Sequence, residues 1–452
     1  MTDFECLIHV DRRVLWHPYT QMRDYEREPF LFVDRAEGIR LFDGEGRAYY
    51  DTISSWWCIV HGHGHPRIKA AVKAQMDRLE QVHFAGTTHR PAILLADRLV
   101  SLSPPGLARV FFSDNGSTAC EVAIKMSFQY WKQAGFPRRE RFISVDRGYH
   151  GDTIGAMSLG GTAGFHGLFV PLFFPSFRIP SPYCYRCPAG RNDPDSCGLD
   201  CLAPLEAILA ERGEEIAGVI LEPLVQAAGG MIVYPVRYLA RLAGIVNAHN
   251  VHLILDEVAT GFGRTGTFFA ADRAGIRPDF LCLSKGLTGG VLPMGATLTT
   301  EEVFQAFCDD YEKGKTFFHG HTFTGNPLAA AAALASLDVF DEEGVMEGLV
   351  KKARRLQEGK ERFRSLPQVG DVRGIGMIAA FEIVRDPMTR ESYDPALRIG
   401  WKIYRAGLEK GLILRPLGDV TYLFLPLSAT EGEIDDILDR TYQVLSGVGR
   451  VA

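Results

Sequence analysis

The sequence predicts an α/β protein with a large domain built on a mainly parallel sheet and a smaller α+β domain formed by both ends of the chain. Three observations predict this fold. From about residue 66 to residue 340, short apolar segments alternate with helical stretches, the pattern of a parallel sheet covered by helices on both faces. The 452 residues are more than one small core needs. Hydrophobic residues make up 46% and charged residues 23% of the chain, which are ordinary proportions for a globular enzyme.

The first segment, residues 1–65, is predicted to form a short β meander that belongs to the smaller domain. Strands are expected at residues 31–33, 38–42 and 48–50, and Asp43-Gly-Glu-Gly46 supplies a turn between the last two. The meander leads into Ser54-Ser-Trp-Trp57. We expect this segment to pack against the C-terminal part of the chain.

The large domain is expected to span residues 66–340 and the rest of the smaller domain residues 341–452. The strands predicted in the large domain are 109–112, 142–145, 218–221, 252–255, 280–283 and 296–298. Helices there include 118–133 and 237–249, and the alanine-rich stretch 329–333 lies in another helix. The C-terminal segment is predicted to contain a strand at 378–384, a helix near 395–410, a strand at 421–425 and a closing helix from residue 431.

Composition excludes several classes of protein. The formal net charge of −6 argues against a nucleic-acid-binding surface, which normally carries a basic excess. The N-terminus lacks the basic and apolar regions of a signal peptide, and no apolar run reaches membrane-spanning length. The nine cysteines are odd in number and mostly scattered through apolar segments, which predicts free thiols in the cytoplasm.

A carboxylate and a lysine follow two successive predicted strands. Val251-His-Leu-Ile-Leu-Asp-Glu-Val258 carries Asp256 at its end, and Asp279-Phe-Leu-Cys-Leu-Ser-Lys-Gly286 carries Lys285. A pyridoxal phosphate (PLP) enzyme needs this pair: the lysine holds the aldehyde as a Schiff base, and the acid keeps the pyridine nitrogen protonated. Taken singly, the residues are equally compatible with a surface turn and a capped loop; together they predict a PLP site.

Other predicted strands also end in polar residues, where open α/β sheets place their ligands. Gly116 and Ser117 begin a helix, and the free N–H groups and positive dipole there suit a phosphate, although a plain helix cap would look the same. Tyr149 follows the strand at 142–145 and is the candidate aromatic residue to lie on the cofactor ring. Glu222 ends the strand at 218–221 and places another acid at this edge.

The chain resembles the class III (ω-type) aminotransferases, a fold-type I PLP family, from Trp16 to about Pro426. Asp256-Glu-Val-Ala-Thr-Gly-Phe-Gly-Arg-Thr-Gly266 followed by Ser284-Lys-Gly286 matches the signature of that family. Four further segments resemble the subfamily that converts 8-amino-7-oxononanoate to 7,8-diaminononanoate in biotin synthesis. They are Leu15-Trp-His-Pro-Tyr-Thr-Gln21, Ser54-Ser-Trp-Trp57, Gly148-Tyr-His-Gly151 and His319-Gly-His-Thr-Phe-Thr-Gly-Asn-Pro327.

The resemblance implies a mainly parallel seven-stranded sheet and a role for each residue of the cofactor site. Lys285 would bind the cofactor and shuttle a proton, and Asp256 would pair with the pyridinium nitrogen. Gly116 and Ser117 would hold the phosphate, with Tyr149 stacked on the ring. Thr322 would complete the phosphate site of the neighbouring subunit, which implies a homodimer with shared active sites.

The implied substrate is a long amino-keto acid, which needs an apolar channel with a cation at its far end. Tyr19, Trp56 and Trp57 would supply aromatic walls, and Arg415 would bind the substrate carboxylate. The alternatives are core aromatics and a surface ion pair. His321 stands where members that use S-adenosylmethionine commonly carry proline, and His319-Gly-His-Thr322 resembles members for which lysine is considered the donor. S-adenosylmethionine is the predicted amino donor, and lysine is the alternative that His321 raises.

A Pro/Gly/Asp-rich insertion at about residues 181–203 departs from the usual pattern of the family. It contains two close cysteine pairs, Cys184 with Cys187 and Cys197 with Cys201, and no histidine. Thiolates at this spacing can converge on one structural zinc ion, and disulfides or free thiols are the alternatives.

The sequence leaves three functional hypotheses. The leading one is a PLP transaminase that makes 7,8-diaminononanoate. The second is another class III ω-aminotransferase acting on a diamine or an ω-amino acid such as β-alanine. The third is a PLP-fold aminomutase or a catalytically silent, zinc-stapled binding protein. Trp56, Trp57 and Arg415 favour the first over the second, and the intact Lys285 and Asp256 argue against a silent protein.

Overall fold

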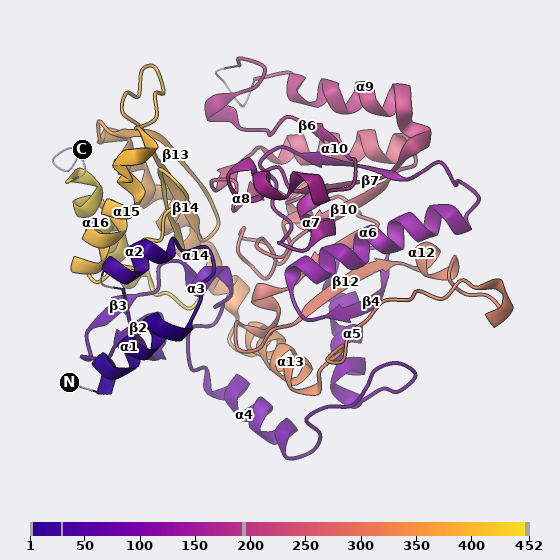
Figure 1. Ribbon diagram of the computed structural model, residues 1–452, viewed down its shortest axis with the longest axis horizontal. Coiled ribbons are helices and arrows are strands. Elements are labelled where there is room, and N and C mark those ends of the chain that lie inside the picture. The colour runs from indigo at the N-terminus through magenta and orange to yellow at the C-terminus, as the bar shows by residue number, and fades with distance from the viewer. Residues whose placement is uncertain (1–2, 29, 192–195, 448–452) are drawn as a thin grey trace.

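The computed structural model describes residues 3–28, 30–191 and 196–447, and its centre is a seven-stranded sheet (Figure 1). In order across the sheet, the strands are β4 (Leu107–Ser113), β12 (Gly295–Thr300), β11 (Phe280–Leu283), β10 (His252–Asp256), β7 (Ile216–Leu221), β5 (Arg141–Val145) and β6 (Phe177–Ile179). Only β12 runs antiparallel to its neighbours among these strands. The predicted mainly parallel, seven-stranded sheet is confirmed.

Both faces of this sheet are buried because successive side chains of each strand point to opposite sides. In β10, Leu253 and Leu255 join the core that contains α10, whereas Ile254 joins a second core that contains α6. The helices around the sheet are α4 (Pro66–Met76), α5 (Arg90–Leu102), α6 (Gly116–Gln133), α7 (Ile154–Leu159), α8 (Ala163–His166), α9 (Ala203–Arg212), α10 (Val236–Ala248), α11 (Ala270–Ala274), α12 (Glu301–Gln305) and α13 (Pro327–Glu342). A short hairpin, β8 (Val225–Gln226) and β9 (Ile232–Val233), follows β7.

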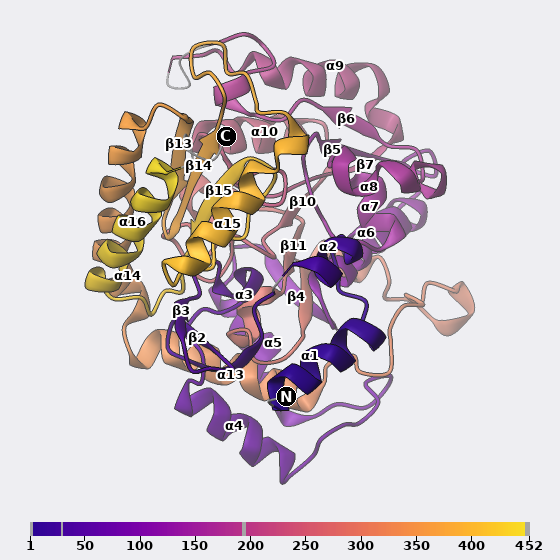
Figure 2. The same cartoon turned by 60° about the vertical axis from the view of Figure 1, so that its left-hand side comes forward.

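The two ends of the chain form a second layered unit beside the large sheet (Figures 1 and 2). The N-terminal elements are α1 (Asp3–Val14), α2 (Met22–Arg27), β1 (Val33–Glu37), β2 (Arg40–Asp43), β3 (Ala48–Tyr50) and α3 (Ser54–Trp57). The C-terminal elements are α14 (Val345–Gly359), β13 (Val369–Ile375), β14 (Ile378–Ile383), α15 (Ile399–Glu409), β15 (Val420–Phe424) and α16 (Glu431–Ser446). Backbone hydrogen bonds join the two segments: Tyr50 N donates to Gly411 O (2.8 Å) and Phe424 N to Thr52 O (2.7 Å). The expected union of the termini in an α+β unit is confirmed, and the boundaries at residues 65/66 and 340/341 stay a prediction.

Two predicted elements are corrected by local turns. The predicted strand at residues 38–42 contains a turn, because Glu37 pairs with Arg40 and Gly38 has φ +56°. The strand before it is therefore β1, directly ahead of Gly38, and not residues 31–33. The helix expected near residues 395–410 begins at residue 399, because Arg398 has φ +51° and interrupts it. The six strands predicted in the large domain lie within two residues of the observed ones.

The cysteine-rich insertion packs against the C-terminal sheet. The Tyr183 hydroxyl donates to the Glu382 carboxylate, and Arg186 Nε donates to Glu382 Oε1 (2.8 Å). The Arg390 guanidinium donates to the Tyr185 carbonyl (2.6 Å). The insertion therefore connects the large sheet to β14. Within the described residues, no helix has the length and apolar character that crossing a membrane requires.

Candidate active site

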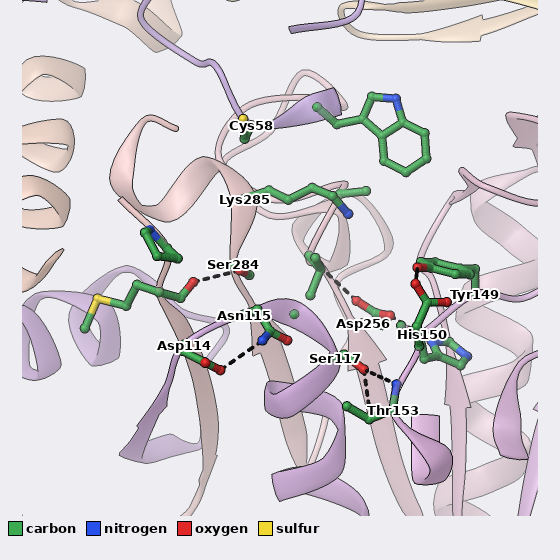
Figure 3. Close-up of a pocket in the computed structure, with 18 of the residues that line it drawn as sticks. Cys58, Asp114, Asn115, Ser117, Tyr149, His150, Thr153, Asp256, Ser284 and Lys285 are labelled. Atoms are coloured by element: carbon green, nitrogen blue, oxygen red, sulfur yellow. Dashed lines mark hydrogen bonds and ion pairs between the residues drawn. The ribbon is translucent and has the colours of Figure 1, made fainter. Parts of the chain in front are cut away.

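The carboxyl ends of β11, β10, β7 and β5 lie side by side and open into a cavity of about 620 Å³ (Figure 3). Seven of the predicted site residues line this cavity. They are Gly116, Ser117, Tyr149, Glu222, Asp256, Lys285 and Trp57. Strands far apart in the sequence therefore bring the predicted cofactor site together.

Asp256 is held as a buried acceptor at the end of β10. Its Oδ1 accepts the Val258 N–H (3.0 Å), and its Oδ2 accepts from His150 Nδ1 (2.7 Å). Asp256 is 3% exposed. The two donors fix the carboxylate in one orientation at the cavity wall, where its charge favours a cation placed against it.

Lys285 follows β11 on a strained backbone. Its φ is +33°, in the left-handed region that non-glycine residues rarely adopt, and such strain concentrates at functional sites. Its Nζ lies 4.9 Å from the centroid of the Trp57 ring. Burial lowers the pKa of the Lys285 amine, while the charges of Asp256 and Glu222 oppose that shift. Lowering the pKa increases the fraction of neutral, nucleophilic amine near neutral pH.

The start of α6 forms a cradle against two neighbouring segments. A Cβ added to Gly116 would lie 2.5 Å from Val258 Cγ1, so only glycine fits there. The Ser117 hydroxyl accepts the Thr153 N–H (3.0 Å) and hydrogen-bonds the Thr153 hydroxyl (2.7 Å). Asn115 caps the helix by accepting the Thr118 N–H (3.0 Å). This N-terminus of an 18-residue helix faces the cavity and suits a phosphate.

Tyr149 and Glu222 are coupled at the ends of β5 and β7. Glu222 Oε2 accepts the Tyr149 N–H (3.0 Å), and its Oε1 accepts the Ala227 N–H (2.9 Å). Burial raises the pKa of Glu222 to about 7. Burial also raises the pKa of the Tyr149 hydroxyl, which keeps this hydroxyl protonated. Glu222 thus fixes the backbone that presents the Tyr149 ring to the cavity.

The short element α3 is a left-handed turn and not a right-handed helix. All four residues have positive φ: +51° at Ser54, +45° at Ser55, +68° at Trp56 and +76° at Trp57. A left-handed conformation costs an L-residue roughly 1–2 kcal/mol, so the surrounding contacts must hold this turn. Trp57 is buried, and its Nε1 donates to the Tyr422 hydroxyl (3.1 Å). The turn places the Trp57 ring beside Lys285 at the cavity wall.

Tyr19, Trp56 and Arg415 form a chain of contacts that starts at Tyr149 on the cavity wall, and we call this group the mouth of the cavity. The Tyr19 and Trp56 rings meet edge to face at 5.6 Å, and the Arg415 guanidinium lies 4.2 Å from the Trp56 ring centroid. The Tyr19 hydroxyl lies 3.3 Å from that of Tyr149, which joins the mouth to the cavity. In residues 3–28, 30–191 and 196–447, no carboxylate forms an ion pair with Arg415. The surface ion pair weighed as an alternative for Arg415 is therefore not formed.

Two titratable residues of this site, Asp152 and His150, were not assigned a role from the sequence. Asp152 accepts from Tyr19 (2.6 Å), from Tyr149 (2.9 Å) and from His166 Nε2 (2.9 Å). His150 holds Asp256, as described above. Both lie in Gly148-Tyr-His-Gly-Asp152, directly after β5, so the position at a strand end was the signal that could have found them.

The structure does not bring Thr322 or the four cysteines to this cavity. Thr322 is exposed, and its carbonyl accepts from Gln81 Nε2 (2.7 Å). The cysteines lie in the insertion, and no disulfide joins them. Among the described residues, one group of side chains places three possible metal-ligand atoms within 4.8 Å of one another: Cys120, His150 and Asp256. The four thiols of the insertion do not form such a group.

The cavity residues fit PLP. A lysine whose pKa is lowered by burial, a fixed buried carboxylate and a glycine-bearing helix N-terminus are the groups that its aldehyde, ring nitrogen and phosphate require. In the described part of the chain, the Lys285 amine has no hydrogen-bond partner, so it is available for covalent attachment. Figure 3 shows Asp256 at the end of β10 and Lys285 just after the neighbouring strand β11, above the helix start that carries Ser117.

Sequence comparison identifies the family of the chain. The family model for aminotransferase class III matches residues 21–445. An adenosylmethionine-8-amino-7-oxononanoate aminotransferase from Geobacter sulfurreducens is 49% identical over 437 residues, which cover 97% of this chain and 96% of that protein. The protein of the same name from Methanocaldococcus jannaschii is 42% identical, with 96% of each chain covered.

Solved structures agree with the fold. The crystal structure of the M. jannaschii enzyme superposes with a TM-score of 0.93 at 41% identity and covers 98% of this chain and 99% of its own. An omega transaminase from Pseudomonas jessenii in complex with PMP gives a TM-score of 0.94 at 33% identity and covers 98% of each chain. The chain belongs to the class III aminotransferases.

Proposed function

We propose that this chain transfers an amino group from S-adenosylmethionine to 8-amino-7-oxononanoate and forms 7,8-diaminononanoate, a step of biotin synthesis. The observation that carries the proposal is the 42–49% identity, over nearly the whole chain, to five relatives whose names state this reaction. The cofactor implied by the family is PLP, which supplies an aldehyde and an electron-accepting ring when bound.

The residues around the cavity would divide the cofactor chemistry between them. Lys285 would attach the cofactor through Nζ and then carry a proton to and from the substrate carbon. Asp256 would hold the proton on the ring nitrogen, since a carboxylate raises the pKa of a base beside it. Gly116 and Ser117 would bind the phosphate through backbone N–H groups, and Tyr149 would cover the ring.

The mouth of the cavity would bind the acceptor. Tyr19, Trp56 and Trp57 offer an aromatic path from Lys285 outward, and Arg415 stands along it beside Trp56. A guanidinium with no intramolecular carboxylate partner can form a bidentate pair with the carboxylate of a long acid. Lysine remains the alternative amino donor because of His321.

We also propose a homodimer in the cytoplasm. Thr322 is exposed in the single chain, as expected for a residue that completes the phosphate site of a partner. Apolar side chains on the same loop, Phe318 (81% exposed) and Phe323 (59%), would be covered by such an interface.

The second candidate is a general ω-aminotransferase, which the similarity to omega transaminases at 32–33% identity favours. Product analysis separates the two candidates. The purified enzyme is incubated with PLP, 8-amino-7-oxononanoate and either S-adenosylmethionine or lysine, and 7,8-diaminononanoate is quantified by mass spectrometry. We expect turnover with one of these donors, whereas turnover of β-alanine or diamines alone, without amination of this acceptor, would contradict the proposal.

A structural zinc ion at Cys184, Cys187, Cys197 and Cys201 is a separate proposal. Its support is the spacing of the two cysteine pairs. Burial, followed by the neighbouring thiols, raises the pKa of Cys184 and Cys201 to about 11, so zinc would have to displace the thiol protons. In the structure, the thiols would have to move closer together to share one ion. Metal analysis of protein purified without added zinc tests it, and less than about a tenth of an equivalent per chain would refute it, since closed cysteine sites hold zinc tightly.

A further inference from the structure

Arg264 is a fully buried cation that no proposed catalytic step uses. It is 1% exposed, and its side chain is among the largest fully buried ones of the described residues. None of the described carboxylates forms an ion pair with it. Burial lowers the pKa of its guanidinium to about 10, which leaves it charged at neutral pH. A buried charge of this kind needs a structural or functional reason.

The hydrogen bonds of the Arg264 guanidinium converge on the left-handed turn α3. Nη1 donates to the Ser54 hydroxyl (3.2 Å) and to the Leu425 carbonyl (2.7 Å). Nη2 donates to the carbonyls of Trp57 (3.4 Å) and Ile59 (2.6 Å). The guanidinium therefore hydrogen-bonds the first and last residues of the turn and Ile59 just after it. It also joins the turn to Leu425, which directly follows β15.

A second set of contacts holds the first half of the turn. Asp51 Oδ1 accepts the Ser55 N–H (2.8 Å), and Asp51 Oδ2 accepts the Ser55 hydroxyl (2.7 Å). The Ser54 hydroxyl donates to the Phe424 carbonyl (2.6 Å). Four consecutive non-glycine residues with positive φ are strained, so the turn keeps its shape only as long as such contacts outweigh the strain.

The turn carries two proposed aromatic walls of the site, and each contacts a different cation. Trp57 packs 4.9 Å from Lys285 Nζ, and Trp56 packs 4.2 Å from the Arg415 guanidinium. If the turn relaxed to a right-handed or extended form, both rings would leave these positions together. The backbone conformation of Ser54–Trp57 therefore places one ring beside the Lys285 amine and the other beside the Arg415 guanidinium.

We propose that Arg264 is a positioning residue: it holds α3 in its left-handed form and thereby places Trp57 against Lys285 and Trp56 against Arg415. Its effect on turnover rests on the proposed use of these tryptophans by the acceptor. Its effect on the two rings does not depend on the identity of the substrate. A purely structural role, in which Arg264 only stabilises the core, predicts no selective movement of these rings.

The test uses Arg264→Lys holoenzyme labelled with 5-fluorotryptophan and observed by ¹⁹F NMR. The chain has five tryptophans, and each resonance is assigned by replacing one tryptophan with phenylalanine. We expect the resonances of Trp56 and Trp57 to shift in the variant and those of Trp131 and Trp401 to stay in place. Because lysine cannot reach four acceptors at once, kcat/KM for the acceptor should fall about 100-fold, the effect of a displacement of roughly 1 Å at a site.

Two matched substitutions at Ser55, added to Arg264→Lys, measure the contribution of the left-handed backbone strain. Ser55→Gly removes the cost of the left-handed conformation, whereas Ser55→Ala removes the same hydroxyl and keeps that cost. In the Arg264→Lys background, Ser55→Gly should return the two resonances toward the wild-type positions and recover about fivefold in kcat/KM. Ser55→Ala should recover neither. Should Arg264→Lys fail to fold, Ser54→Ala removes one acceptor of the guanidinium and should show the same pattern with a smaller amplitude.

Three results would overturn the proposal: unchanged Trp56 and Trp57 resonances in Arg264→Lys, an equal shift of all five, or equal rescue by glycine and alanine. The wild-type assay is read separately. If the wild-type enzyme does not aminate 8-amino-7-oxononanoate, the proposed function fails, and the NMR comparison still decides the role of Arg264.

Discussion

Replacing Arg415 by methionine keeps most of the volume of the side chain and removes its charge. Arg415 packs against Trp56 and pairs with no described carboxylate, so the variant leaves no acidic group of the protein unpaired. The loss should therefore appear in the binding of the acceptor and not in stability. Hydrogen bonds to a charged group contribute about 1.5–3 kcal/mol. At about 1.4 kcal/mol per tenfold change, this predicts a fall of about 10- to 150-fold in kcat/KM for 8-amino-7-oxononanoate.

The assay compares the acceptor with its methyl ester, which has no carboxylate to pair. For the wild-type enzyme, kcat/KM should be lower with the ester than with the free acid, by about the same factor that Arg415→Met loses with the free acid. For Arg415→Met, kcat/KM should be nearly the same with the ester and the acid. Arg385→Met is a matched control, because Arg385 pairs with Glu391 in an exposed ion pair (3.2 Å) outside the cavity. The reasoning would be refuted if Arg415→Met still rejected the ester as strongly as the wild type, or if Arg385→Met lost as much.

Three further predictions concern the cofactor site. Lys285→Ala should fold, bind PLP only non-covalently and lose transamination by several orders of magnitude in single-turnover assays. Substantial remaining turnover would reject the role of Lys285. Asp256→Asn removes a charge that raises the pKa of the Lys285 amine, so the pH midpoint for PLP uptake by the apoenzyme should move to lower pH; an unchanged or higher midpoint would contradict this. Gly116→Ala should weaken PLP binding in a titration, because the new Cβ would lie 2.5 Å from Val258 Cγ1. The control Gly348→Ala, at a helical position where no atom beyond the adjacent residues and the helix's own backbone lies within 4 Å of the new Cβ, should bind PLP normally.

The strand ends of the site could be predicted because each depends on a short local pattern. An apolar run followed by Asp256 or Lys285 predicts both a buried strand and a polar residue at its end. By contrast, β6 has only three residues and β13 contains Gly370, Asp371 and Gly374, so neither shows a strand pattern. Their pairing comes from neighbouring strands in the folded protein.

The shape of the mouth could not be predicted from local patterns. The positive φ values of Ser54–Trp57 are held by Arg264 and Phe424, which lie more than two hundred residues away in the sequence. The sequence Ser-Ser-Trp-Trp contains no glycine to indicate a left-handed turn. Similarly, the carboxylate of Asp152 collects hydroxyl groups from Tyr19 and Tyr149, and only the folded chain brings Tyr19 there.

The central claim is that Lys285 carries PLP and passes an amino group to an oxo acid. Its most direct test is the visible absorbance of the purified protein supplied with PLP, recorded while substrates are added one at a time. We predict that the absorbance band of the lysine-bound cofactor disappears on addition of S-adenosylmethionine, or of lysine, and returns on addition of 8-amino-7-oxononanoate. The absence of any such band in the presence of PLP, or a band that no amino donor changes, would contradict the assignment of Lys285.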